Sequence, residues 1–143
     1  KKFAELKLDN KIFHCNISFT VKKGTIRGLH FQNEPYSESK LIRCTAGKIF
    51  DVIIDLRKHS DTYLQWYSIE LSATDYHMLY VPKGFAHGFQ TLSDNTEVFY
   101  QNSQIHMPDY ENGVKWNDKL FDIVWPLIPT LVSKKDQSWK NYE

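Results

Sequence analysis

The chain has 143 residues, of which 41% are hydrophobic and 24% are charged, and its formal net charge is +1. This length and composition predict a globular fold with a real hydrophobic core rather than a disordered segment. The nearly balanced charge lacks the basic field that favours binding to nucleic acid or to an anionic membrane surface. No apolar run approaches the roughly 18 residues of a membrane-spanning helix.

The two cysteines, Cys15 and Cys44, lie far apart and form no CxxC motif. Their spacing argues against a zinc knuckle and against a disulfide scaffold, and it favours a reducing cytoplasm. No signal peptide is visible. The chain does not begin with Met, and its opening KKFAELKL is typical of the end of an amphipathic helix. We therefore expect residues 1–143 to form a single domain that lacks its N-terminal portion.

The first alternating segment follows this short helix. Residues 11–20 place Phe13 and Ile17 on an apolar face and His14 and Asn16 on a polar face. This alternation predicts a strand with one apolar face.

The segment at residues 24–32, GTIRGLHFQ, brings an arginine, a histidine and a glutamine onto one short strand. On a regular strand His30 and Gln32 share a face and Arg27 points away from it. Gly28 can host a bulge that re-aims one of these side chains. By spacing alone, a buried structural histidine with a surface arginine is favoured over a functional site.

Residues 33–39 contain Pro35 among Ser and Asn and predict a loop that leads to Lys40. The next segment, residues 41–57, predicts a hairpin of two strands joined at Ala46 and Gly47. Its second strand carries apolar residues on one face and charged residues on the other.

Further alternating segments complete the pattern. Residues 63–71 predict a strand, and Pro82–Gly84 suits a type I turn between two strands, with His87 just past it. Residues 96–103 predict a strand that carries Tyr100. Six or more short strands separated by turn residues indicate an all-β sandwich or barrel of the jelly-roll kind. The aromatic tail, which prolines interrupt, is expected to wrap around this barrel.

A metal site is one candidate chemistry, because many jelly-roll barrels hold a divalent ion through clustered His and Glu side chains. Neither His30 nor His87 is followed by a second histidine two residues further on, so the usual ligand spacing fails. The chain has no GxSxG nucleophile elbow and no GxGxxG or GxxxxGK phosphate loop. A site held by the two histidines and a carboxylate remains a minor alternative.

Acid–base chemistry fits the remaining residues. His30 is a candidate base with an orienting carboxylate, and Lys40 is a candidate donor to an anion. Tyr100 is a candidate acid, and Arg27 and His87 are candidate donors to an anion. Each of these residues, taken singly, also fits an ordinary core or surface role.

Several stretches together resemble one protein family. They are GTIRGLHFQ, SKLIRCTAGKIFDVIIDLR, YVPKGFAHGFQTL, TEVFYQ and KWND with a later WP. From about Asn16 to Asp136 the chain is similar to the dTDP-4-dehydrorhamnose 3,5-epimerase family of nucleotide-sugar epimerases. The resemblance implies a cupin-type double-stranded β-helix (jelly-roll) barrel with short peripheral helices, and a homodimer. It also implies epimerisation of a 4-keto sugar linked to a nucleotide diphosphate, with no metal and no other cofactor.

The same resemblance implies roles for individual residues. His30 matches the catalytic base, and Asp136 matches the carboxylate that orients and charges it. Tyr100 matches the acid that delivers a proton from the opposite side, and Lys40 matches the lysine that stabilises the enolate oxygen. The residues expected to bind the substrate are Arg27, at the diphosphate, His87, Asn16 and Gln32.

The chain departs from the family pattern in two places. Relatives carry QDN or QCN where this chain has residues 14–16, and an aromatic pair where it has Ile105 and His106. The expected reaction is epimerisation at C3, C5 or both of dTDP-4-dehydro-6-deoxy-D-glucose or a close analogue, for surface polysaccharide synthesis. A nucleotide-sugar 3,4-ketoisomerase and a non-catalytic sugar-binding barrel remain alternatives.

Overall fold

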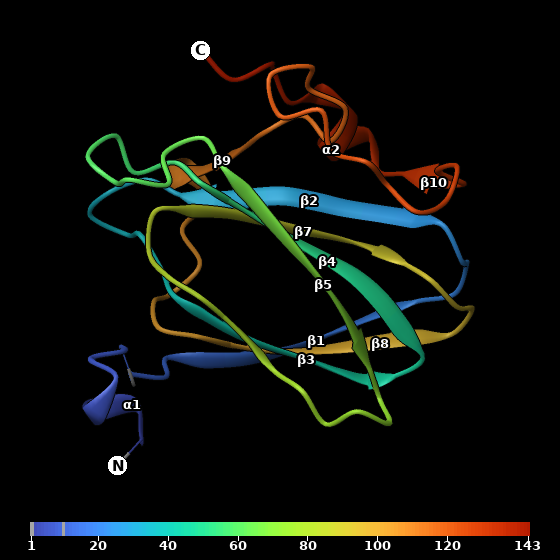
Figure 1. The fold of residues 1–143 in the computed structure, drawn as a ribbon, viewed down its shortest axis with the longest axis horizontal. Coiled ribbons are helices and arrows are strands. Elements are labelled where there is room, and N and C mark those ends of the chain that lie inside the picture. Colours follow the sequence, from blue (N-terminus) through green and yellow to red (C-terminus); the bar gives the residue numbers. More distant parts are fainter. Residues whose placement is uncertain (1, 10) are drawn as a thin grey trace.

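The computed structural model describes residues 2–9 and 11–143 and consists mainly of two β-sheets that face each other (Figure 1). In spatial order, the four-stranded sheet contains β1 (His14–Thr20), β8 (Thr96–Asn102), β3 (Lys40–Ala46) and β6 (Leu79–Val81). The other sheet contains β10 (Leu131–Val132), β2 (Thr25–Gln32), β7 (Phe85–Thr91), β4 (Lys48–Asp55) and β5 (Trp66–Ser72), with β9 (Glu111–Gly113) paired to β2. The predicted all-β jelly-roll architecture is confirmed.

Helical structure is short and peripheral. It comprises α1 (Lys2–Glu5), the 3₁₀-helix η1 (Pro108–Tyr110) and α2 (Lys134–Ser138). Across the described residues, we find no helix with the length and hydropathy needed to cross a membrane. α1 packs at one end of the four-stranded sheet, where the ring of Phe3 meets the ring of Tyr80 edge-on.

The main hydrophobic core lies between the two sheets. Its buried side chains come from both of them and are Ile42, Cys44, Ile49, Ile53, Leu71, Val81, Phe89 and Val98. On β4, Ile49 and Ile53 belong to this core, whereas Val52 and Ile54 belong to a second buried cluster. The strand is therefore buried on both faces, which explains why apolar residues occur on both of them.

The C-terminal tail covers the outer face of the larger sheet (Figure 1, orange to red). Val52 and Ile54 of β4 are fully buried in a cluster to which the tail contributes Val114 and Phe121, with Trp125 packed against it. The predicted wrapping role of the tail is confirmed. Its aromatic content serves this packing, because large rings bury much apolar area per residue.

The predicted hairpin at residues 41–57 is wrong, although both of its strands are present. β3 pairs with β6 and β8, whereas β4 pairs with β5 and β7, so the two strands belong to opposite sheets. The chain crosses between the sheets at Gly47, whose φ is +76° and where a Cβ would lie 2.8 Å from Oγ1 of Thr96. Alternation defines a strand and its two faces, but it does not define which sheet the strand joins.

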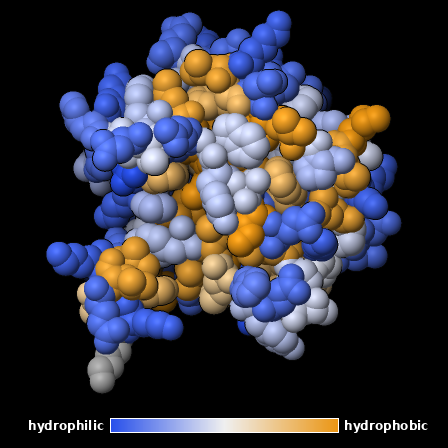
Figure 2. Space-filling model, viewed as in Figure 1, coloured by the Kyte–Doolittle hydropathy of each residue, from blue (hydrophilic) through white to orange (hydrophobic). Residues whose placement is uncertain are grey.

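β1 is an edge strand with an exposed apolar face. The side chains of Phe13, Ile17 and Phe19 expose 63%, 64% and 54% of their surface. Among the strands of the described chain, β1 pairs only with β8. Figure 2 shows apolar surface near the N-terminal end of the chain, at the lower left of that view. Exposed apolar surface of this kind on a sheet edge is typical of an interaction surface.

Candidate active site

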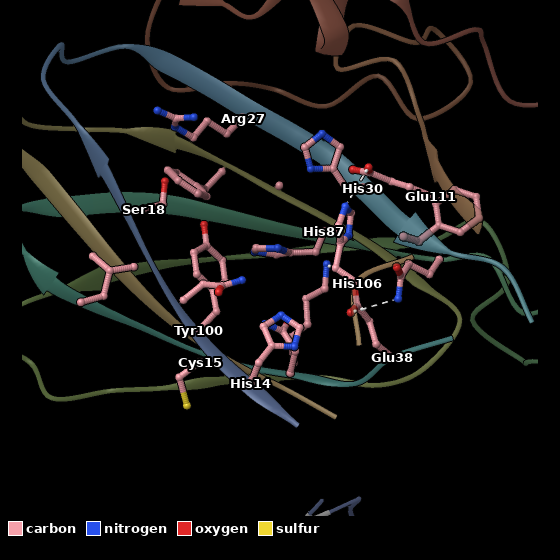
Figure 3. A pocket seen from close by; sticks show the side chains of 18 residues that line it. His14, Cys15, Ser18, Arg27, His30, Glu38, His87, Tyr100, His106 and Glu111 are labelled. Atoms are coloured by element: carbon pink, nitrogen blue, oxygen red, sulfur yellow. Dashed lines mark hydrogen bonds and ion pairs between the residues drawn. The ribbon is translucent and has the colours of Figure 1, made fainter. Parts of the chain in front are cut away.

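A cavity of about 530 Å³ opens between the sheets (Figure 3). Its walls come from β1, β3 and β8 on one side and from β2 and β7 on the other. The predicted site residues that line it are His30, Tyr100, Lys40, Arg27, His87, Asn16 and Gln32. Asp136 lies outside this lining, on α2, and reaches the cavity through its contact with His30. The structure therefore brings together residues that the chain places more than 100 positions apart.

A bulge in β2 brings Arg27 and His30 to the same cavity. The pairing of β2 with β7 shifts its register between these two residues, and Gly28 between them has a φ of +107°. A Cβ at Gly28 would lie 2.7 Å from Cα of Gly88, so only glycine allows the strands to approach this closely. The predicted bulge is confirmed. Without it, Arg27 would point away from the face that carries His30.

His30 and Asp136 form a hydrogen-bonded pair. Nε2 of His30 lies 2.5 Å from Oδ1 of Asp136, and the two side chains expose 31% and 5% of their surface. Because a carboxylate can only accept, Nε2 of His30 is the donor. In a neutral imidazole the lone pair then lies on Nδ1, which makes Nδ1 the basic atom of the pair.

Asp136 is positioned by the start of α2. Ser133 is the N-cap residue of this helix, and its hydroxyl accepts a hydrogen bond of 3.0 Å from the backbone N–H of Asp136. Burial alone would raise the pKa of Asp136, but the hydrogen bond and charge of His30, with Ser133 and the Gly28 backbone, outweigh burial and lower the pKa. The carboxyl therefore stays ionised and can stabilise a positively charged imidazole.

Tyr100 lines the cavity from β8, on the sheet that faces β2. Its ring meets the ring of His87 edge-on, with 6.1 Å between the centroids. Burial raises the pKa of the Tyr100 hydroxyl and the charge of Asp51 raises it further, while Arg27 and Ser18 offset only part of this effect. The phenol therefore keeps its proton at neutral pH and can act as an acid.

His87 is paired with a carboxylate that the sequence analysis missed. Nε2 of His87 donates to Oδ1 of Asp51 at 2.6 Å, and both side chains are buried. The second oxygen, Oδ2, is buried without a hydrogen-bond partner in the described part of the chain. The pair fixes the His87 ring in the cavity wall. A signal for Asp51 does exist in the sequence, because it is the charged residue between Ile49 and Ile53 on the core face of β4.

Lys40 begins β3 after the predicted loop of residues 33–39, in which no strand forms. Its Nζ lies 3.0 Å from Oε1 of Glu38, and the two side chains expose only 12% and 10% of their surface. The backbone N–H of Ser39 donates to Oγ of Ser103 at 2.8 Å, which ties the end of the loop to the neighbouring segment. A fixed, largely buried cation therefore stands in the cavity wall.

Gln32 lines the cavity, but its amide is occupied by the surrounding backbone. Nε2 donates to the carbonyls of Tyr36 and Ile105 at 2.9 and 3.1 Å, and Oε1 accepts from the backbone N–H of Met107 at 2.6 Å. These bonds hold two loops of the cavity wall together. They support a structural role for Gln32 in the cavity wall, in addition to its predicted role in substrate binding.

Arg27 and Asn16 are exposed members of the cavity wall. Nε of Arg27 donates to Oγ1 of Thr20 at 2.8 Å, and a terminal nitrogen donates to the carbonyl of Phe19 at 3.4 Å. These contacts hold the guanidinium against β1. Its remaining N–H groups suit an oxyanion such as phosphate, because the planar donor set matches two acceptor oxygens at once.

Several polar residues of the cavity wall were not predicted as site residues. They are His14, Ser18, Glu38, Asn102, His106 and Glu111. Alternation indicates His14 and Ser18, because both share the polar face of β1 with Asn16. Glu111 depends on the pairing of β9 with β2, which no local pattern reveals.

The arrangement suits proton transfer to and from a polar ligand held between the sheets. His30 with Asp136 supplies a base on one wall, and Tyr100 supplies an acid on the other. Lys40 supplies an ammonium group that can stabilise negative charge on an oxygen of the ligand, and His87 lines the wall beside Tyr100 while its Nε2 donates to Asp51.

Comparison with known proteins identifies one family. The dTDP-4-dehydrorhamnose 3,5-epimerase family profile matches residues 1–143. The chain is 46% identical over 114 residues to the dTDP-4-dehydrorhamnose 3,5-epimerase of Shigella flexneri, and this match covers 80% of the chain and 63% of that relative. The match thus spans less than two thirds of the length of the relative.

Solved structures show the same architecture. The dTDP-4-dehydrorhamnose 3,5-epimerase of Bacillus anthracis, with TDP and PPi bound, superposes with a TM-score of 0.95 and 42% identity over 99% of this chain and 81% of that one. The dTDP-6-deoxy-D-glucose-3,5-epimerase of Legionella pneumophila, in complex with dTDP-4-keto-L-rhamnose, has a TM-score of 0.91 and 34% identity over 98% of this chain and 74% of that one. The cupin-type barrel expected from the resemblance is confirmed, and this chain belongs to the dTDP-4-dehydrorhamnose 3,5-epimerase family.

Proposed function

We propose that this chain epimerises a 4-keto-6-deoxy sugar linked to dTDP, at C3, C5 or both, without a cofactor. One observation carries the proposal: His30 on β2 and Tyr100 on β8 line the same cavity from facing sheets (Figure 3). Inversion of a carbon requires that a proton leaves from one face of the sugar and returns to the other. A base and an acid on opposite walls meet this requirement.

The first step removes the proton from a carbon next to the ketone. Nδ1 of His30 takes the proton, the electron pair of the C–H bond forms a C=C bond, and the ketone oxygen becomes an enolate. Asp136 stabilises the imidazolium that forms, through the 2.5 Å hydrogen bond. The ammonium group of Lys40 meets the charge on the enolate oxygen, which lowers the barrier because this charge exists only after proton removal.

The second step returns a proton to the opposite face. Tyr100 gives its hydroxyl proton to the enolate carbon while the electron pair on the oxygen reforms the ketone. The raised pKa of Tyr100 keeps the phenol protonated until this step. Its place beside His87 puts a second hydrogen-bonding group at the sugar.

The nucleotide diphosphate is expected at Arg27. The guanidinium is fixed by β1 and offers N–H groups to phosphate oxygens. Asn16 lines the cavity from the same strand, β1, and is exposed to a ligand. The relatives from Bacillus anthracis and Legionella pneumophila hold TDP with PPi and dTDP-4-keto-L-rhamnose, which supports a dTDP-linked keto sugar as the substrate.

The identity of the product tests this proposal. The protein is incubated with dTDP-4-dehydro-6-deoxy-D-glucose, and the configuration of the sugar is read from ¹H NMR coupling constants. Inverted carbons with the ketone still at C4 support epimerisation. A ketone moved to C3 identifies a 3,4-ketoisomerase, and an unchanged sugar that still binds identifies a non-catalytic barrel; both outcomes contradict the proposal.

Asp136→Asn is expected to slow epimerisation by on the order of tenfold to a hundredfold, with KM little changed. The amide removes the charge that stabilises the imidazolium, but it leaves the His30 ring in place. Initial rates measured by ¹H NMR check this expectation. Asp122→Asn, at an exposed position of the tail, is the matched control. Full activity in Asp136→Asn would show that another carboxylate serves His30.

We further infer that two copies of the chain associate through the outer face of the four-stranded sheet. Phe13, Ile17 and Phe19 are exposed there, and Phe99 of β8 lies opposite Ile17 in the sheet. A contiguous apolar face on an edge strand is unfavourable in water and is stabilised when a second copy covers it. The N-terminal helix α1 lies at the far end of this sheet, next to β6.

Ile17→Lys is expected to convert a dimer into a monomer, because the charge would be buried without a partner at the interface. Size-exclusion chromatography with light scattering measures the mass. Ile128→Lys, at a tail position that is 90% exposed, should leave the mass unchanged. A wild-type chain that is already monomeric, or an unaffected Ile17→Lys dimer, would rule out this interface.

The cellular setting is proposed by analogy with the family. Both cysteines are free thiols, with Cys15 exposed and Cys44 buried, which suits a reducing compartment such as the cytoplasm. The product would be a precursor of a 6-deoxy sugar in surface polysaccharide.

A further inference from the structure

We propose that Trp139 and Gly113 are positioning residues that hold α2 so that Asp136 reaches His30. The inference rests on the proposed function, in which His30 is the base. It concerns residues outside the cavity lining, because neither Trp139 nor Gly113 belongs to the cavity wall. It follows from two contacts that join α2 and its C-cap residue, Trp139, to β9, and from a third contact between Lys135 and Trp139.

The first contact is between the indole of Trp139 and the bare backbone of Gly113. A Cβ at Gly113 would lie 2.6 Å from Nε1 of Trp139 and equally close to other atoms of the ring. The indole therefore rests directly on the glycine, and any larger residue would displace it. The Nε1 atom is buried without a hydrogen-bond partner in the described residues, so packing and not hydrogen bonding holds the ring.

The second and third contacts involve Lys135. Its Nζ lies 2.6 Å from both carboxylate oxygens of Glu111, at the other end of β9. The same ammonium group lies 6.0 Å from the centroid of the Trp139 ring. Two residues thus attach α2 to β9: Lys135, which precedes Asp136, and Trp139, which follows the helix.

α2 depends on these contacts because it spans only Lys134–Ser138. A helix this short is unstable in water without tertiary packing. Ser133 caps its first turn, but a cap sets the start of the helix and not its place on the sheet. β10 pairs with β2 just before the helix, and the contacts of Lys135 and Trp139 with β9 then set where Asp136 lies.

The register of the sheet connects these contacts to the base. Gly113 is the cross-strand partner of His30, so the residue beneath Trp139 lies directly beside the base. The ring of Trp139 also meets the ring of His30 edge-on, with 6.2 Å between the centroids. Loss of the indole would remove one side support of the imidazole and would release α2 at the same time. A displacement of about 1 Å at a reacting group can reduce a rate by up to a hundredfold.

Two readouts test the proposal. In the free protein, we expect the Nε2 proton of His30 to give a downfield ¹H NMR signal, because Nε2 lies 2.5 Å from Oδ1 of Asp136. Trp139→Ala should weaken or abolish this signal and should lower kcat by about tenfold with KM unchanged. Trp139→Phe, which keeps an aromatic ring on Gly113, should retain most of both. Lys134→Ala, on the exposed surface of α2, is the matched control and should change neither.

Gly113→Ala gives an independent disturbance, because the added methyl group pushes the indole away without removing it. It should reproduce the loss of the signal, and in a Trp139→Ala background it should have no further effect. Asp136→Asn and Trp139→Ala combined should be no slower than Asp136→Asn alone, because each change takes the negative charge of Asp136 away from His30. An intact Nε2 signal in Trp139→Ala, or additive losses of rate, would overturn the proposal. The NMR signal is measured without substrate. This test of Trp139 and Gly113 therefore remains valid even if the chain does not catalyse the proposed reaction.

Discussion

His30→Asn is expected to abolish exchange of solvent deuterium into a 4-keto nucleotide sugar while leaving binding nearly intact. The substitution removes the base, whose contribution to proton transfer is on the order of 10² to 10⁴ in rate. It leaves Arg27 and its fixed contacts to β1 unchanged, so the diphosphate should still bind. ¹H NMR in deuterium oxide measures exchange, and calorimetry with dTDP measures binding.

The matched control for this variant is His77→Asn. His77 is exposed in the connection between β5 and β6 and does not line the cavity, so its substitution should change neither exchange nor binding. Exchange retained at both C3 and C5 in His30→Asn would remove His30 from the mechanism. Binding lost together with exchange would instead assign it to the nucleotide site.

Tyr100→Phe is expected to stop inversion while proton removal continues. The variant keeps the ring and its packing against His87 but deletes the hydroxyl proton that the enolate takes up from the opposite face. The imidazolium formed by His30, which is partly exposed, can exchange its proton for solvent deuterium and return it to the enolate on the same face. Deuterium should therefore enter the substrate with its original configuration, which NMR separates from the epimer.

A purely structural tyrosine predicts the opposite outcome. Phenylalanine conserves the shape and the apolar area of the ring, so the substitution would be nearly silent if the hydroxyl were incidental. Tyr76→Phe, at a position that is 74% exposed, is the control and should leave the reaction unchanged. Unchanged production of the epimer by Tyr100→Phe would leave water or His87 as the proton source.

Local patterns predicted most strands of this barrel but not how the strands combine. The predicted strands that correspond to β1, β2, β4 and β8 are all present. Alternation marks β1 clearly because its two faces meet different environments, whereas β4 is buried on both faces. The same alternation at residues 41–57 predicts a hairpin, but the chain crosses from one sheet to the other at Gly47. The apolar face of β1 likewise gave no sign that it would be exposed at an edge.

The site was predictable in part. The bulge at Gly28 was expected from a glycine inside a strand, and it accounts for the shared cavity of Arg27 and His30. Asp136 stands 106 positions from His30, and only the family resemblance pointed to it, because no local pattern relates residues so far apart. The sequence places Asp51 on β4, but it does not show that this carboxylate pairs with His87, which lies 36 positions away on β7.

The central claim is that protons leave and return on opposite faces of one sugar between His30 and Tyr100. It is tested most directly by incubating the wild-type protein with dTDP-4-dehydro-6-deoxy-D-glucose in deuterium oxide and locating the label by NMR. The account predicts deuterium at C3, C5 or both, and inverted configuration at every labelled carbon of the product. Label that enters without any inversion, or inversion without label, would contradict it.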